Sequence, residues 1–172
     1  MFFIKHAAPQ IVAGVPPALW HLSADGKAAC QALAVRLAPH QPTLLFCSHE
    51  LKAIETAALT AQHLGAKVQL AADLHEHDRT NAPYYATKEE FEDAVRRFFH
   101  LPDQLVFGAE TANQARARFV RAADGIRAAH GDRAIIVAHG TVITLYAAAR
   151  LGVDEFEMWR RLQLPDVVQV GH

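Results

Sequence analysis

The sequence predicts an α/β protein in which helices cover both faces of a mostly parallel sheet. Short apolar runs typical of buried strands alternate with longer segments whose apolar residues recur at helical spacing. Capping residues, glycines and prolines fall between these segments, where they mark the ends of elements. Because the 172 residues contain no repeat, low-complexity tract or linker, we expect residues 1–172 to form one domain with three α/β/α layers.

Five segments are expected to form the strands of this sheet. Residues 2–4 begin the chain, residues 44–47 form a second apolar run, and residues 68–70 form a third strand. Residues 134–138, Ala-Ile-Ile-Val-Ala, are the clearest buried strand, and residues 167–170 are the last candidate. Strands that alternate with helices are typical of parallel sheets, because parallel strands need long crossover connections.

Five helices are expected between and after these strands. Ser23 and Ser48 are candidate N-caps, and Thr87 with Glu90 has the spacing of a capping box. Glycine and proline end helices, since one favours the left-handed conformation and the other cannot continue the hydrogen-bond ladder. The expected helices run from Ser23 to Pro39, Ser48 to Gly65, Thr87 to Pro102, Thr111 to Gly131 and Gly140 to Gly152.

Composition excludes several classes of protein and partner. A hydrophobic content of 51% argues against a disordered chain. Lys plus Arg total 17 and Asp plus Glu total 18, a balance that argues against a nucleic-acid partner or an anionic lipid surface. No apolar run reaches the ~18 residues of a membrane span. Cys30 and Cys47 are too few for a disulfide framework, so we expect a reducing, cytoplasmic setting.

Histidine is abundant, with 11 residues, and it follows each of the first four predicted strands. In open α/β sheets, ligands bind beyond the carboxyl ends of the strands, so these residues are expected to converge on one site. Lysine lies close to two of the strand ends. The residues concerned are Lys5 and His6, then Ser48, His49 and Lys52, then the loop from His75 to Arg79, and finally His139 with Gly140.

Five segments in a fixed order carry a family resemblance. They read FFIKHAAP, LSADGKAACQALAVRL, CSHELKAIETA, LHE and IIVAHG. In this order they resemble the histidine phosphatase (phosphoglycerate mutase-like) superfamily, from Met1 to about Leu151. The resemblance implies a phosphoglycerate mutase-like fold and the phosphatase branch of the family. This sequence departs from the family pattern at Lys5 and Lys52, where the family usually has arginine. Lysine keeps the positive charge but lacks the planar guanidinium fork that binds two phosphate oxygens at once.

The resemblance implies a phosphomonoester hydrolase that works without a metal or cofactor. His6 would be the nucleophile and form a phosphohistidine. Glu76 would protonate the leaving oxygen and then activate water, which calls for a pKa raised toward neutrality. His6 and Lys52 can also be interpreted as residues with a purely structural role. His6 would then be a strand-end histidine bonded to backbone, and Lys52 a solvated residue paired with Glu55.

The same resemblance implies a cationic cradle for the phosphoryl group. Its members would be Lys5, Lys52 and a protonated His139, and the hydroxyl and helix N-terminus at Ser48 would add donors. Arg79 is the candidate to compensate for the missing arginines. The residues expected at the substrate pocket are His49, Arg79 and Gly140. The substrate would be a small phosphorylated molecule or a phosphoprotein.

Two other functions remain open at this stage. A phosphate-binding module of the same fold, catalytically weak or inactive, would need the cations but would tolerate the loss of arginine geometry. A metal-dependent hydrolase would use His75, His77 and Asp78 as ligands, although the rest of a dinuclear pattern is absent from the sequence.

The aromatic segment at about residues 80–108 has two interpretations. It is either a short covering segment over the substrate or a core helix with aromatic anchors. Phe156, Met158 and Trp159, on the last predicted helical stretch, are candidates for the contact of a homodimer.

Overall fold

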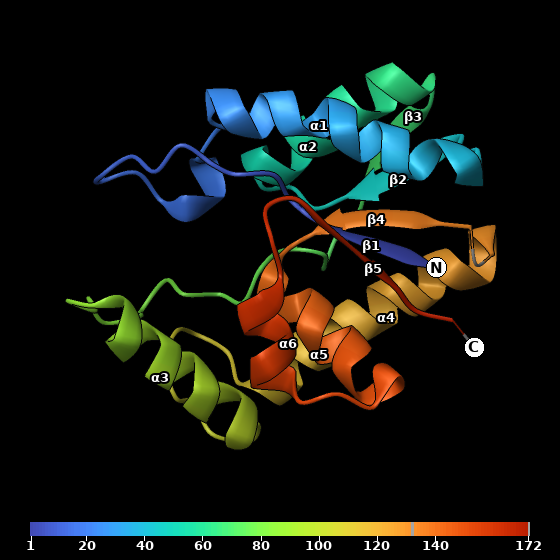
Figure 1. Ribbon diagram of the computed structural model, residues 1–172. Coiled ribbons are helices and arrows are strands. Elements are labelled where there is room, and N and C mark those ends of the chain that lie inside the picture. Colours follow the sequence, from blue (N-terminus) through green and yellow to red (C-terminus); the bar gives the residue numbers. More distant parts are fainter. Residues whose placement is uncertain (132, 172) are drawn as a thin grey trace.

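A five-stranded sheet separates two layers of helices, which confirms the predicted fold class (Figure 1). The computed structural model describes residues 1–131 and 133–171. Four strands are parallel, and the edge strand β5 runs antiparallel to β1. In sheet order, the strands are β3 (Lys67–Leu70), β2 (Leu44–Cys47), β4 (Ile135–Ala138), β1 (Phe2–Lys5) and β5 (Asp166–Gln169).

The helices lie in two layers, and α3 is outermost in the lower layer of Figure 1. Helices α1 (Ala24–Leu37) and α2 (Leu51–Leu64) cover one face of the sheet. The other face carries α4 (Ala112–His130) and α5 (Gly140–Leu151), with α6 (Glu155–Arg161) packed on α5. The remaining helices are α3 (Lys88–His100) and two short 3₁₀ helices, η1 (Pro17–Leu19) and η2 (Ala38–His40).

Side chains of each central strand alternate between the two cores, because successive residues of a strand point to opposite faces. In β1, Phe2 and Ile4 belong to the cluster under α1 and α2. Phe3, between them, belongs to the cluster under α4 and α5, where its ring lies 4.6 Å from that of Tyr146. The sheet is therefore buried on both sides, as its apolar runs predicted.

Most predicted helix ends are confirmed by their caps. Ser23 accepts a hydrogen bond from the Gly26 N–H, the predicted capping box of Thr87 and Glu90 is present, and Thr111 and Gln114 form another. Gly65 closes α2 with a positive φ of 66°. The start of α2 is different, because its N-cap is Glu50 rather than Ser48. The Ser48 hydroxyl instead accepts the Glu50 N–H and bonds to His139.

The aromatic segment is anchored in the core through α3. Phe98 and Phe107 are buried in a cluster shared with α5 and α6. This agrees with the interpretation as a core helix with aromatic anchors. Phe156 and Trp159 pack into the same cluster, and the two rings stack at 6.0 Å. Phe156 is buried, while Met158 and Trp159 stay partly exposed, and their contact in a homodimer stays a prediction.

Within the described residues, no helix combines the length and hydropathy that a membrane span requires.

The loop after β1 passes directly over the first turn of α1. A Cβ at Gly26 would lie 2.1 Å from the carbonyl oxygen of Ala8. The Ser23 N–H and hydroxyl both donate to that same oxygen, at 3.0 and 3.1 Å. This close approach needs glycine for its lack of a side chain, and it fixes the chain that leaves His6.

We expect Gly26→Ala to lower the free energy of unfolding by about 2–3 kcal/mol, because the new methyl group collides with backbone that has no room to move. Gly125→Ala is the matched control. Gly125 lies inside α4 and its added Cβ meets nothing within 4 Å, so this change should be neutral or stabilise by about 0.5–1 kcal/mol. Urea denaturation measures both, and equal effects would contradict the proposed collision.

Candidate active site

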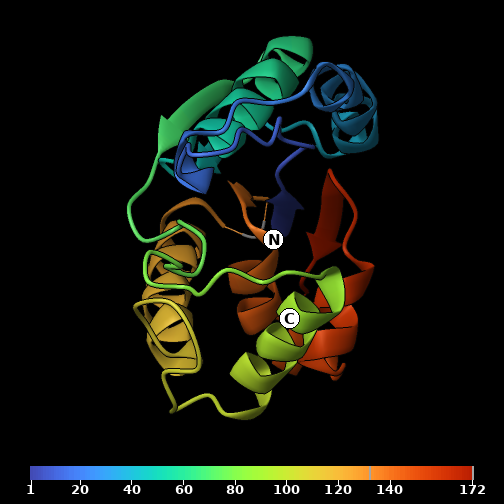
Figure 2. The same cartoon turned by 90° about the vertical axis from the view of Figure 1, so that its left-hand side faces the viewer.

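A cavity of about 610 Å³ opens at the carboxyl ends of the parallel strands. One wall is formed by residues 9–20, which we call the rim segment, and the other by the loop of residues 75–80. In Figure 2 the blue rim segment lies above the green chain that leads from β3 to α3. The polar side chains that line the cavity include His6, Glu50, Lys52, His75, Glu76 and Arg79.

His6 directly follows β1, and its N–H continues the ladder by donating to the carbonyl of Ala138. Its ring Nδ1 lies 2.8 Å from the carbonyl oxygen of Ala7. A carbonyl only accepts, so Nδ1 carries the proton and the lone pair of Nε2 is free. Burial, together with the neighbouring His139, lowers the pKa of His6 to about 3. His6 is thus hydrogen-bonded to the backbone and is also a neutral imidazole. The structural role at the end of a strand and the role as nucleophile, both considered from the sequence, are therefore compatible.

His139 is fully buried beside His6 and is not among the residues that line the cavity. It follows β4 as the N-cap of α5, and its ring centroid lies 5.2 Å from that of His6. Its Nε2 is 2.7 Å from the Ser48 hydroxyl. Burial is the main cause that lowers the pKa of His139 to about 3. The side chain is therefore neutral at neutral pH in this structure, which differs from the protonated form expected from the sequence.

Glu76 reaches the N-terminus of α5 from the loop after β3. Its two oxygens accept the N–H groups of His77, at 2.8 Å, and of Thr141, at 3.2 Å. Burial acts to raise the pKa of Glu76, but Arg79, His139 and these two N–H groups outweigh it and lower the pKa to about 2. The raised pKa expected from the sequence is therefore wrong for this state, because the loop places a cation and two donors beside the carboxylate.

The structure brings Lys52 to the cavity, where its ammonium donates to the Pro17 carbonyl at 2.8 Å and pairs with Glu50. The alternative pairing with Glu55 is not seen. Glu55 instead accepts the N–H of Leu22 at 2.8 Å. Lys52 therefore links α2 to the rim segment and carries one of the positive charges of the cavity wall.

Lys5 interacts electrostatically with Glu76 and Arg79 of the cavity, but its ammonium is hydrogen-bonded elsewhere. Its ammonium donates to the Leu162 carbonyl at 2.9 Å, and it is not among the residues that line the cavity. Gly140 lies against it, since a Cβ there would be 3.3 Å from Lys5 Cε. Burial lowers the pKa of Lys5. The two lysines predicted for one cradle are thus placed differently, and Gly140 also lies outside the cavity lining.

Arg79 brings an arginine to the cavity from the loop after β3. Its Nη2 donates to the Thr141 hydroxyl at 3.0 Å and lies 3.8 Å from a Glu76 oxygen. Its guanidinium lies over the rings of Phe91 and Phe107, at 5.1 and 6.0 Å from their centroids. Among the described residues, its buried Nε has no hydrogen-bond partner. Arg79 therefore presents a positioned fork with a donor to spare.

Glu50 is a cavity residue that the sequence reasoning missed. One oxygen accepts the Glu76 N–H at 2.7 Å and lies 3.3 Å from His139 Nε2, while the other pairs with Lys52. Its side chain is only 12% exposed. The sequence did offer one indication of this role, because Glu50 lies between Ser48 and Lys52, which were both predicted site residues.

Arg118 was also missed, because it lies on α4 and far from any strand end in the sequence. Its buried guanidinium donates to three carbonyls of the loop after β3 and pairs with Glu110. Glu110 in turn accepts the Asp78 N–H at 2.9 Å. Nothing in the sequence pattern indicated this contact. The carbonyls that Arg118 binds belong to Asp73, His75 and Glu76.

Of the remaining predicted residues, His77 and Asp78 also line the cavity. His49 is exposed and outside the cavity lining. His77 packs against the rings of Phe98 and Phe107, and Asp78 accepts hydrogen bonds from Thr80. Across residues 1–131 and 133–171, no group of three His, Cys, Asp or Glu side chains could hold a metal ion. This geometry does not support His75, His77 and Asp78 as a metal site.

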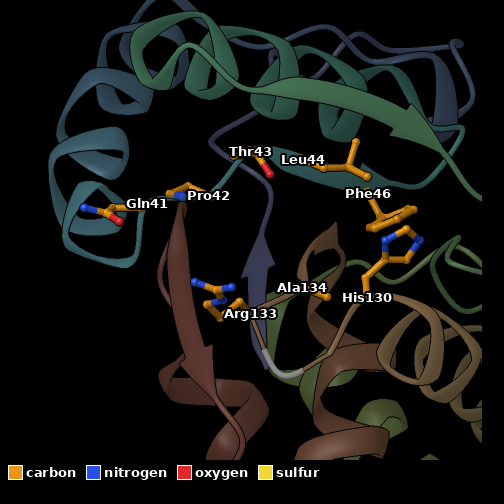
Figure 3. Close-up of a pocket in the computed structure, with 8 residues that line it drawn as sticks. All are labelled: Gln41, Pro42, Thr43, Leu44, Phe46, His130, Arg133 and Ala134. Carbon is orange, nitrogen blue, oxygen red and sulfur yellow. The ribbon is translucent and has the colours of Figure 1, made fainter.

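A second cavity, of about 230 Å³, lies at the opposite end of the sheet (Figure 3). The ring of His130 packs there against that of Phe46, with centroids 4.8 Å apart, and Arg133 lies at the same cavity. Its described lining residues include no carboxylate. The candidate active site is therefore the larger cavity, where histidines, cations and carboxylates meet.

Solved structures of several phosphatases share this fold. A mycobacterial glucosyl-3-phosphoglycerate phosphatase has a TM-score of 0.68 and 20% identity, covering 93% of this chain and 82% of that one. An alpha-ribazole phosphatase from Shigella flexneri has a TM-score of 0.63 and 22% identity, covering 93% and 84%. A putative phosphohistidine phosphatase from Agrobacterium tumefaciens has a TM-score of 0.52 and 12% identity, covering 98% and 89%.

The comparison with curated proteins finds no match. Residues 18–170 match the profile of the histidine phosphatase superfamily (branch 1). The match covers most of the chain and includes Lys52, Glu76 and His139, while His6 lies just before it. The chain therefore belongs to the histidine phosphatase superfamily, branch 1.

Proposed function

We propose that the protein is a phosphomonoester hydrolase that acts through a phosphohistidine on His6. The observation that carries this proposal is the state of the His6 ring. Its Nδ1 is fixed on the Ala7 carbonyl, its pKa is lowered to about 3, and it lies in a cavity with Lys52 and Arg79. A neutral imidazole with a free Nε2 is the form that attacks phosphorus.

In the first step, Nε2 of His6 forms a bond to phosphorus while the bond to the ester oxygen breaks. The leaving oxygen takes its proton from Glu76. In the second step, Glu76 takes a proton from water, the resulting hydroxide attacks phosphorus, and the bond to His6 breaks. Lys52 and Arg79 stabilise the charge on the transferring oxygens. The scheme requires no metal ion or cofactor.

Substrate binding itself would prepare the acid. A phosphoryl dianion placed beside His139 and Glu76 raises the pKa of both groups, because negative charge favours their protonated forms. The low pKa values of this structure then belong to the state before substrate arrives. Glu76 would gain the proton that it donates as the phosphoryl group binds.

The second candidate is a phosphate-binding module without useful turnover. This candidate is favoured because both lysines are already bound by groups of the protein. Lys52 pairs with Glu50, and Lys5 donates to the Leu162 carbonyl. The structural neighbours include a glucosyl-3-phosphoglycerate phosphatase, an alpha-ribazole phosphatase and a putative phosphohistidine phosphatase. We therefore keep both a small phosphorylated molecule and a phosphoprotein as substrate classes.

We expect His6→Ala to lower turnover of an aryl phosphate by about a thousandfold or more, because no other group can form the covalent intermediate. His63→Ala, at the exposed C-terminal end of α2, is the matched control and should keep the wild-type rate. Near wild-type turnover by His6→Ala would contradict the mechanism. Tight phosphate binding by the wild-type protein without turnover would favour the binding module.

Lys52→Met should raise the KM for the same aryl phosphate by about tenfold, since it removes a partly buried positive charge from the cavity wall. Lys27→Met is the control, because Lys27 is exposed on α1. Steady-state kinetics distinguish the two variants. An unchanged KM would mean that the Lys52 ammonium does not contact the phosphoryl group.

Anion binding should be coupled to proton uptake. The pKa of His139 is about 3 and that of Glu76 about 2, so both groups are deprotonated near neutral pH. A bound dianion raises both values, so affinity should increase as pH falls from about 8 to about 5. Sulfate is a suitable probe because its own charge is constant over this range. Calorimetric titration at several pH values measures the effect.

The Glu76→Gln variant tests the assignment of this coupling. It removes one of the two titrating groups, so the affinity for sulfate should depend less steeply on pH than in the wild-type protein. An affinity that is independent of pH in the wild-type protein would show that neither group gains a proton on anion binding.

A further inference from the structure

Glu50 is the carboxylate of the cavity that the proposed reaction does not use. It is the N-cap of α2, and 12% of its side chain is exposed. One of its oxygens accepts the Glu76 N–H at 2.7 Å and lies 3.3 Å from His139 Nε2. Its other oxygen pairs with the Lys52 ammonium. Each oxygen of this carboxylate is therefore engaged by a group of the site.

These partners are the groups that would hold a phosphoryl group. Lys52 supplies a positive charge, His139 faces the nucleophile, and the backbone N–H of Glu76 is a donor directed at an anion. A carboxylate and a phosphate accept hydrogen bonds from the same kinds of donor. Glu50 thus occupies, within the protein, donors that an incoming phosphate would otherwise receive.

The charges of the cavity lead to the same conclusion. Lys52 and Arg79 supply two positive charges to the cavity lining, and Glu50, Glu76 and Asp78 supply three negative ones. The histidines His6 and His139 are neutral at neutral pH, since burial lowers the pKa of each to about 3. A phosphate dianion that enters this set meets no excess of positive charge, so it gains little Coulombic attraction.

We propose that Glu50 is a specificity-determining residue, an internal anion that competes with phosphoryl oxygens for Lys52 and His139. The proposal rests on the proposed function for the place where the phosphoryl group binds. To bind there, the phosphoryl group must displace the Glu50 carboxylate from the Lys52 ammonium. Glu50 thereby weakens the binding of free phosphate.

This competition selects a class of substrate. If the phosphoryl group alone gains little free energy of binding, the remainder of the substrate must supply the affinity through its own contacts. The cavity offers a largely apolar wall for this purpose in the rim segment, with Pro16, Pro17 and Trp20 among its lining residues. The site then favours phosphomonoesters whose alcohol part packs on that wall, and it releases inorganic phosphate readily after hydrolysis.

The test is the affinity for inorganic phosphate, measured by calorimetry near neutral pH. Glu50→Gln removes the charge and keeps the shape and an acceptor for the Glu76 N–H, so we expect phosphate to bind about tenfold more tightly. Glu89→Gln removes the same charge from the exposed first turn of α3 and should leave the affinity within about twofold of wild type. Glu50→Ala, which also removes the carboxylate, should behave like Glu50→Gln.

A gain in affinity is a readout that damage to the structure does not produce. If Glu50 only positions Lys52 and His139, both variants will bind phosphate more weakly than the wild-type protein, and the proposal is overturned. An unchanged affinity overturns it as well, because the carboxylate then does not compete. The measurement needs no turnover, so an inactive wild-type protein would contradict the proposed hydrolase while leaving this competition open to the same titration.

Discussion

The contact between Arg118 and the loop after β3 is the constraint on which the site depends. β3 is an exposed edge strand, and the last bond from this part of the chain to β2 is that of the Ala71 N–H to the Cys47 carbonyl, before the loop begins. Arg118 binds the Asp73, His75 and Glu76 carbonyls and pairs with Glu110. Breaking a buried pair of this kind costs about 3–5 kcal/mol in other proteins, because it leaves one charge without compensation.

Once this loop is fixed, the electrostatics of the cavity follow. Glu76 is placed at the N-terminus of α5, where the Thr141 N–H and Arg79 stabilise its ionised form. Arg79 is held between Thr141 and the rings that α3 anchors in the core. A contact on α4, distant from the cavity in sequence, therefore positions the loop that carries the residue expected to act as the acid.

The cations of the cavity differ in what they can offer a phosphoryl group. Lys52 brings a single ammonium, which cannot grip two oxygens in the same plane as a guanidinium does. Arg79 supplies a planar fork from a different loop, and Glu50 places a counter-charge beside Lys52. The cavity keeps its cations, but their partners in the protein decide how much of that charge a substrate meets.

The sequence by itself determined the elements and their order. Apolar runs predicted five strands of a mostly parallel sheet, and Ser23, Thr87 and Thr111 marked helix starts that the structure confirms. These signals are local, because capping and strand burial involve residues a few positions apart. Strand-end position also placed His6 and Glu76 at the cavity, since parallel strands bring their carboxyl ends to one edge.

Only the tertiary structure decided which charges meet. It turned Lys5 toward the Leu162 carbonyl, paired Lys52 with Glu50 rather than Glu55, and placed Arg118 under the loop of Glu76. The pKa of Glu76 and of His139 followed from these contacts and from burial. Such pairings join residues far apart in the chain, or choose between carboxylates near the same lysine, and hydrophobic periodicity carries no information about either choice.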